Sequence, residues 1–221
     1  MKITLISDLH NKYKQLTLPG GDIIICSGDM TSRGYKHEIE NFCKWFSNLD
    51  NYKHKVFISG NHDFGFEERP AETYEMIVPF NITYLQDSFV VINGVKIYGT
   101  PWQPEFNHWA FNLPKNSDRL QEKWNMIPVD TDILLTHGPP FGILDKVIGG
   151  STSLGCELLL DKVKDIKPKI HVFGHIHTGY GYVRDDNTHF FNASILNESY
   201  IYTQKPWTFE WDKDTNEILF E

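Results

Sequence analysis

Short apolar runs, each followed at once by polar residues, recur along this chain. The runs cover residues 3–7, 23–28, 56–60, 133–136 and 170–174. Runs of β-branched residues bounded by Gly and polar residues predict buried strands of an α/β sheet. In open α/β sheets, the loops at the carboxyl ends of the strands form the ligand-binding edge. The polar residues behind the five runs are therefore expected to meet at one rim.

Three segments between the runs have the spacing of amphipathic helices. Residues 35–49 place one apolar face on Ile39, Phe42, Cys43, Phe46 and Leu49. This helix fits the right-handed crossover that joins the second predicted strand to the third. Residues 117–127 and 153–166 predict two further helices, and Pro168 stops the second of them.

Additional β structure is expected outside the five runs. Residues 89–99 predict a hairpin with Asn93-Gly94 at a type I′ turn, and residues 181–194 predict another. Residues 207–212 predict a late strand. Periodicity alone therefore gives an α/β fold with a mixed sheet.

Composition favours one enzyme domain. The chain has 221 residues, is 40% hydrophobic and contains no repeats or linkers, so residues 1–221 are expected to form a single domain. Its net charge of −8 argues against binding to duplex nucleic acid, which depends on clustered Lys and Arg. A small phosphorylated substrate remains compatible with that charge, because bound cations would dominate the local field.

The cysteines and the first apolar run bear on location. Cys26, Cys43 and Cys156 lie far apart without a CxxC pattern, which is typical of free thiols in a reducing compartment. The run at residues 3–7 is too short for the core of a signal peptide or for a membrane span. We therefore expect a cytoplasmic protein without a membrane partner; the sequence specifies no oligomeric state.

The polar residues that follow the five runs are a set of metal-ligand types. They are Asp8, His10, Asp29, Asn61, His137, His175 and His177. Imidazole and carboxylate suit Mn, Fe, Zn and similar ions, and none of these loops offers a thiolate. Asp29 stands alone in its loop, between two loops that carry several polar groups, so it is the expected bridge between two cations. The sequence therefore predicts a binuclear metal centre.

His62 and Asp63 follow directly behind Asn61, in the motif GNHD. His62 is expected either to donate a proton above the metals or to hydrogen-bond a metal ligand, and the catalytic role is favoured because an alkoxide leaving group needs a general acid. Asp63 either orients His62 or caps the following turn, and we favour orientation. Both residues are therefore candidates for catalysis.

The segment 101–114 gathers four aromatic residues, Trp102, Phe106, Trp109 and Phe111. It is either a structured loop that packs on the core or a wall of the cleft, where Trp102 and Trp109 could stack on a nucleobase. Arg33 either contacts the substrate phosphate or is solvated. His171 alternates with apolar residues inside its strand, so a hydrogen bond in the core is favoured over a role as ligand.

The motifs DLH, GD, GNHD, THG and GHIH occur in this order from Asp8 to His177. In that order they resemble the calcineurin-like metallophosphoesterase superfamily. Residues 84–114, 127–142 and 167–181 further resemble its metallophosphoesterase-domain-containing subgroup, the brain protein 239-like proteins. The resemblance implies a four-layer α/β/β/α sandwich of two mixed β-sheets.

The resemblance also implies roles for the individual residues. One metal would be held by Asp8, His10, Asp29 and His177. The other would be held by Asp29, Asn61, His137 and His175. His62 would handle the proton at the leaving group.

The expected function is hydrolysis of a small phosphodiester, cyclic or otherwise nucleotide-like, by a hydroxide that bridges the two metals and attacks phosphorus. Two divalent ions are expected, Mn²⁺ or Fe first, with Zn²⁺, Ni²⁺ and Mg²⁺ as alternatives, because Mg²⁺ rarely accepts so many imidazoles. A phosphomonoesterase or protein phosphatase on the same site is the alternative enzyme. A non-catalytic metal-binding scaffold is the alternative from another class.

Overall fold

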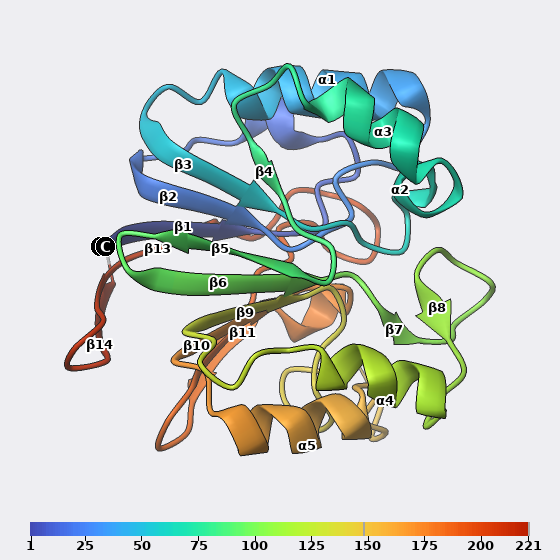
Figure 1. The fold of residues 1–221 in the computed structure, drawn as a ribbon, viewed down its shortest axis with the longest axis vertical. Helices are drawn as coiled ribbons and strands as arrows, with labels where there is room; N and C mark the ends of the chain where they lie inside the picture. The colour runs from blue at the N-terminus through green and yellow to red at the C-terminus, as the bar shows by residue number, and fades with distance from the viewer. Residues whose placement is uncertain (148, 221) are drawn as a thin grey trace.

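The computed structural model describes residues 1–147 and 149–220, and two six-stranded β-sheets lie face to face in it (Figure 1). In spatial order, the first sheet consists of β14 (Glu217–Phe220), β13 (Trp207–Asp212), β1 (Lys2–Ile6), β2 (Gly21–Cys26), β3 (Tyr52–Phe57) and β4 (Thr83–Tyr84). The second sheet consists of β11 (Gly181–Arg184), β12 (His189–Asn192), β10 (Ile170–Phe173), β9 (Ile133–Thr136), β6 (Val95–Thr100) and β5 (Ser88–Ile92).

Both sheets are mixed. Strands β1 to β4 run parallel, and β13 and β14 continue the first sheet antiparallel. In the second sheet β6, β9, β10 and β12 run parallel, with β5 and β11 antiparallel at the two edges. The five runs predicted as strands are therefore strands, but they divide between two sheets rather than sharing one.

Helices cover the outer face of each sheet (Figure 1). The first sheet is covered by α1 (Lys36–Ser47), α2 (Phe64–Glu68) and α3 (Pro70–Ile77). The second is covered by α4 (Asp118–Asn125) and α5 (Glu157–Ile166). Two 3₁₀ turns, Tyr13–Gln15 and His177–Gly179, and a short parallel pair, β7 (Gln103–Pro104) and β8 (Asn112–Leu113), complete the fold. The predicted four-layer α/β/β/α sandwich is confirmed.

Three apolar clusters hold the four layers together. The cluster between the sheets contains residues of both, such as Leu5 and Ile25 from the first and Ile97 and Val172 from the second. Separate clusters join the first sheet to α1 and α3, and the second sheet to α4 and α5. Each fully buried Leu, Ile or Phe stabilises the fold by about 1.5–3 kcal/mol. This packing fixes the strand ends that carry the polar motifs.

The predicted hairpins and most helices occur where the pattern placed them. At the β5–β6 turn, Asn93 and Gly94 have φ of 51° and 77°, as a type I′ turn requires. Helix α5, however, begins at Glu157 and not at residue 153. The later start follows from backbone pairing, because Cys156 bonds Pro139 and Phe141 in the loop behind β9 instead of a helical turn. Gly155 allows this close approach, since a Cβ there would collide with the Pro140 carbonyl oxygen.

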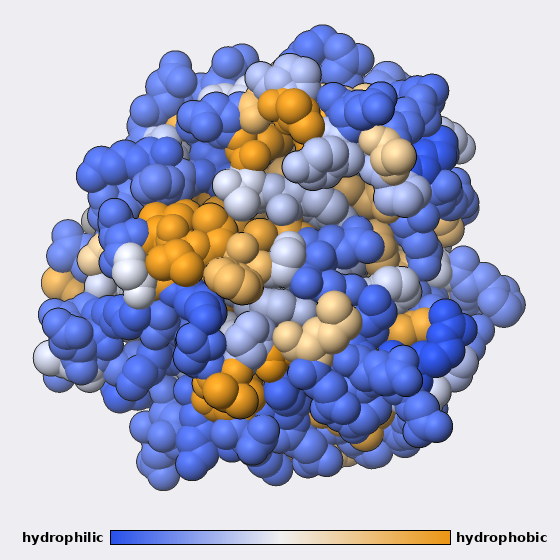
Figure 2. Space-filling model, in the orientation of Figure 1, coloured by the Kyte–Doolittle hydropathy of each residue, from blue (hydrophilic) through white to orange (hydrophobic). Residues whose placement is uncertain are grey.

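Exposed apolar residues on the face seen in Figure 2 form separate patches. One lies over the β5–β6 hairpin, where Phe89 and Val91 are about half exposed at the edge of the second sheet. Among the described residues, no helix combines the length and the apolar character needed to cross a membrane.

Candidate metal centre

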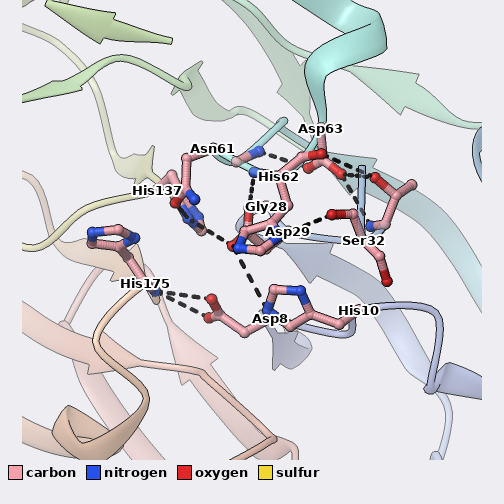
Figure 3. Close-up of polar contacts among 12 residues, drawn as sticks. Asp8, His10, Gly28, Asp29, Ser32, Asn61, His62, Asp63, His137 and His175 are labelled. Atoms are coloured by element: carbon pink, nitrogen blue, oxygen red, sulfur yellow. Dashed lines mark hydrogen bonds and ion pairs between the residues drawn. The ribbon is translucent and has the colours of Figure 1, made fainter. Parts of the chain in front are cut away.

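The polar side chains behind five strands meet at one place (Figure 3). Asp8 and His10 follow β1, Asp29 follows β2, Asn61 follows β3, His137 follows β9, and His175 and His177 follow β10. Three overlapping groups have ligand atoms within 4.8 Å of one another: Asp8, His10 and His177; His10, Asp29 and His62; and Asp8, Asp29 and His137. The side chains come from both sheets, so the centre spans the two layers.

Asp29 lies at the middle of this arrangement. Its Oδ2 is 3.4 Å from Nε2 of His137, 3.7 Å from Nε2 of His10 and 3.9 Å from Nε2 of His62. Its Oδ1 accepts a hydrogen bond of 2.8 Å from the backbone N–H of His62. A carboxylate that faces histidines from three different loops is placed as a ligand shared by two cations would be.

Asp8 forms the other acidic corner. Its Oδ1 is 3.4 Å from Nε2 of His177, and its Oδ2 accepts a hydrogen bond of 2.7 Å from the Ser194 hydroxyl. The backbone N–H of His175 donates to both oxygens at 3.1 Å. These contacts fix the carboxylate while leaving Oδ1 facing His177.

Backbone carbonyls fix the orientation of two histidine rings. Nδ1 of His137 donates to the Ser27 carbonyl at 2.9 Å, and Nδ1 of His177 donates to the Asn197 carbonyl at 3.0 Å. A proton held at Nδ1 leaves the Nε2 lone pair free for a metal, which is the usual arrangement around ligand histidines. Nε2 of His137 also lies 2.9 Å from Oδ1 of Asn61, so the two atoms face the same point.

His10 carries the clearest sign that cations fit here. Both of its ring nitrogens are buried, and neither has a hydrogen-bond partner within residues 1–147 and 149–220. Asp8 and Asp29 are 0% and 2% exposed, and among the same residues their ion-pair contacts reach only histidines. Buried carboxylates without Lys or Arg partners require another source of positive charge. Divalent cations bound by this donor set would supply that charge.

The carboxylates already draw positive charge onto the rings beside them. Burial lowers the pKa of His137, but the charge of Asp29 outweighs burial and raises that pKa to about 9. Burial acts against His177 in the same way, and its contact with Asp8 raises the pKa to about 9. The pKa of His10 falls to about 4, since burial dominates there. The field that favours protons on His137 and His177 would equally favour cations between the two carboxylates.

Four of the candidate ligands have unusual backbone geometry. Asp8, His10, Asp29 and His175 have φ of 56°, 40°, 52° and 67°, in the left-handed region that costs non-glycine residues energy. A Cβ at Gly174 would collide with Oδ2 of Asp8. The backbone is therefore held in strained conformations to bring the ligand side chains together.

His175 is the one predicted ligand whose ring lies outside the three groups. Its contact with the centre is the backbone N–H bond to Asp8, and its ring lies 5.1 Å from that of His137, centroid to centroid. Figure 3 shows the His175 ring beside His137 with its edge turned away from Asp8.

Besides its backbone bond to Asp29 and its ring contact with His10, His62 has two further contacts. Its Nδ1 donates to the Ser32 carbonyl at 2.9 Å, and its ring stacks on Trp109 with centroids 4.2 Å apart. Asp63 does not take part, contrary to the favoured prediction. Its carboxylate accepts hydrogen bonds from Thr31 and from the backbone N–H of Gly60, so it ties the loop behind β2 to the loop behind β3.

The three residues predicted to contact substrate have other partners in the structure. The indole N–H of Trp102 donates to Asp87, and the ammonium of Lys123 lies over the ring. Trp109 stacks on His62, and the guanidinium of Arg33 lies 4.8 Å from the centroid of the Trp109 ring. Roles for these residues in substrate binding stay predictions.

Two residues at the centre were not predicted from the sequence. Ser194 donates to Asp8, and the ring of Tyr200 packs edge-on against His10 and His177 at 4.7 and 5.5 Å. Neither directly follows one of the five apolar runs. Ser194 and Tyr200 reach the centre through long-range folding of the chain, so no local sequence pattern indicates them.

A cavity of about 490 Å³ opens beside His175 and His177. Its lining includes Phe106, Leu154 and Tyr200. The candidate ligands therefore border a space of a size typical for small-molecule sites, roughly 300–1,000 Å³.

A four-layer sandwich with acidic and histidine ligands at the strand ends is the architecture of metal-dependent phosphoesterases. The family model described as calcineurin-like phosphoesterase matches residues 1–179, and this chain belongs to that family.

Relatives support the same family. Metallophosphoesterase domain-containing protein 1 of Homo sapiens is 39% identical over 221 residues, which cover 90% of this chain and 67% of that protein. A UPF0046 protein of Caenorhabditis elegans is 34% identical over 97% of this chain and 77% of its own length. The crystal structure of TT1561 of Thermus thermophilus superimposes with a TM-score of 0.67 at 15% identity, covering 100% of this chain and 97% of that one, and shows the fold alone.

Proposed function

We propose that this protein is a phosphodiesterase that hydrolyses a small, nucleotide-like phosphodiester with two divalent cations. The position of Asp29 carries the proposal, because its Oδ2 faces His10, His62 and His137 from three separate loops. Asp8, His10, Asp29 and His177 would hold one cation, and Asp29, Asn61, His137 and His175 the other. When bound, the cations would supply an activated water and offset charge on the phosphate oxygens.

The protein's own residues would orient the reaction. The Asp29 carboxylate keeps the two halves of the centre together, and the carbonyls of Ser27 and Asn197 hold His137 and His177 in the tautomer that presents Nε2. Phosphate oxygens entering between the two halves would meet positive charge from both sides, which stabilises the extra charge of the transition state.

His62 would protonate the departing oxygen. The bond from Nδ1 to the Ser32 carbonyl fixes one ring nitrogen, so Nε2 is the atom directed toward the centre, 3.9 Å from Oδ2 of Asp29. A leaving alkoxide needs such a proton, and histidine is the most common side chain for this transfer.

The cavity beside His175 and His177 favours a diester over a monoester. A monoester has one ester substituent, the leaving group. A diester has a second substituent that stays on the phosphate, and the cavity could bind it. The same space also favours a small molecule over a phosphoprotein, which would need a docking surface outside the cleft. Mn²⁺ or Fe is the proposed metal because the ligands are mostly imidazoles.

Hydrolysis of two model esters tests the proposal. Bis-p-nitrophenyl phosphate and p-nitrophenyl phosphate would be compared with chelator-treated protein and after addition of Mn²⁺. We expect metal-dependent release of p-nitrophenol with a higher kcat/KM for the diester. A higher kcat/KM for the monoester would favour a phosphomonoesterase. If neither ester releases p-nitrophenol in a metal-dependent way, a non-catalytic metal-binding scaffold would be favoured.

The cytoplasm is the proposed location, with a small phosphorylated molecule as the partner. The three cysteines, Cys26, Cys43 and Cys156, are buried and unpaired. Thiols of this kind are usual in a reducing compartment.

A further inference from the structure

The cavity beside His175 and His177 is lined by Gln103, whose side-chain amide is held in one orientation by hydrogen bonds. Gln103 is 2% exposed. The Asn112 side chain donates to the Phe106 carbonyl at 2.8 Å, so its oxygen faces Gln103 and accepts from Gln103 Nε2 at 3.1 Å. This chain of bonds orients the Gln103 amide, because each group can act only as the donor or acceptor that its neighbour leaves open.

The orientation leaves Oε1 of Gln103 as an unused acceptor. This atom is buried without a hydrogen-bond partner among the described residues. It lies next to Gly138, another lining residue, where an added Cβ would sit 3.5 Å from Oε1. A buried acceptor without a donor is unfavourable, so a ligand N–H in the cavity would be bound with selectivity.

The walls of the cavity suit a flat ring. Phe106 is 54% exposed, and its ring lies edge-on to His175 at 6.3 Å between centroids. Leu154, Pro139 and Val147 supply further apolar lining. An exposed aromatic face beside aliphatic walls favours an aromatic heterocycle, because stacking and burial of apolar area act together.

We infer that this cavity receives the heterocyclic base of a nucleoside that esterifies the scissile phosphate, with an N–H of the base donating to Oε1 of Gln103 and Phe106 packing against the base. The inference rests on the proposed function and identifies where the ester substituent that is not the leaving group binds. It assigns base recognition to Phe106 rather than to Trp102 or Trp109, neither of which contributes to the described lining of the cavity.

Two diesters with the same leaving group test the role of Phe106. Adenosine 5′-(p-nitrophenyl phosphate) and methyl p-nitrophenyl phosphate differ only in the ester substituent that would occupy the cavity. Phe106→Ala should raise KM for the adenosine ester roughly 5- to 150-fold and change KM for the methyl ester less than about twofold. Phe89→Ala is the matched control, because Phe89 is similarly exposed but lies on β5 and does not line the cavity. It should leave both substrates unchanged.

A second variant tests the hydrogen bond to Gln103. Gln103→Met removes the acceptor at similar size and should raise KM for the adenosine ester about 10-fold. The corresponding ester of purine riboside, whose base has no N–H, should be unaffected. If Gln103→Met does not fold, as judged by circular dichroism, the same two esters compared on wild type must still differ in KM in favour of adenosine. Equal KM values would exclude the hydrogen bond to Gln103.

Binding measurements separate this inference from the proposed function. Calorimetry with adenosine 5′-monophosphate and with inorganic phosphate needs no turnover. Phe106→Ala should weaken binding of the nucleotide and leave phosphate binding unchanged, even if no ester is hydrolysed and the proposed function fails. An equal loss for nucleotide and phosphate, or an equal loss of nucleotide binding in Phe89→Ala, would overturn the inference.

Discussion

Trp109 stacks on His62, with ring centroids 4.2 Å apart and planes inclined by 28°. The guanidinium of Arg33 also lies over the Trp109 ring, so Trp109 contacts both the candidate general acid and a cation. The Trp109 ring and the Ser32 carbonyl at Nδ1 together leave the His62 ring little freedom to turn. Through Trp109, the aromatic segment 101–114 contacts the candidate general acid.

The stacking on His62 predicts a positioning role for Trp109. Trp109→Ala should lower kcat roughly 10- to 100-fold for a diester with an alkyl leaving group, because small displacements of a catalytic group are costly. KM should change little, since the ring is occupied by His62. Trp109→Phe keeps an aromatic face and should retain most of the rate. A rise in KM for nucleotide substrates without a fall in kcat would instead support direct stacking on substrate.

His62 is predicted to act through the leaving group and not through the metals. His62→Ala should keep its metal content and lose on the order of 10²–10⁴-fold in rate toward an alkyl or ribose leaving group. Toward a p-nitrophenyl ester the loss should be much smaller, because that phenolate needs no proton. His137→Ala is the comparison, since it damages the metal centre and should slow both esters alike. Equal losses for His62→Ala on the two esters would point to phosphate positioning.

His171 predicts a pH dependence of stability that is independent of the metal centre. The side chain is fully buried in β10, and Nε2 bonds the Thr136 hydroxyl, as a core role predicts. Burial lowers its pKa from 6.5 to about 3. The unfolded chain therefore takes up a proton below pH 6.5 while the folded protein does not. Stability from this residue is complete above pH 6.5 and is lost as the pH falls toward 3.

Denaturant unfolding in chelator measures this effect. Between pH 7 and pH 5 the neutral ring of His171 should account for a loss of about 2 kcal/mol in the free energy of unfolding. His171→Gln keeps a hydrogen-bonding side chain without a titrating ring, so its loss over the same range should be smaller by that amount. The same pH dependence in both proteins would contradict the neutral, buried state of His171.

The sequence brings the candidate ligands to notice because each one lies just behind a predicted strand. A strand end is a local feature, so the apolar runs before Asp8, Asp29 and Asn61 are enough to place them. The contacts that orient the site are not local. Ser194 reaches Asp8 across 186 positions of the chain, and no pattern near Ser194 indicates that contact.

In the fold, too, some features follow from the local sequence and others depend on contacts between distant segments. Strand and helix periods are visible in the sequence, but the assignment of β9 and β10 to a second sheet depends on packing across the inter-sheet core. Strands β4, β7 and β8 have two residues each, too few to show any period. The role of Asp63 is not visible in the sequence for a related reason, because its contacts with Thr31 and Gly60 depend on the approach of two loops.

Metal content of the wild type and of Asp29→Asn tests the central claim most directly. Elemental analysis of protein purified without chelator should find close to two divalent ions per chain in the wild type, since both cations would share Asp29. Asp29→Asn removes the shared negative charge and should lose metal together with activity, while circular dichroism shows an intact fold. A wild type that binds no more than one ion, or an Asp29→Asn variant with full metal content, would contradict a binuclear centre bridged by Asp29.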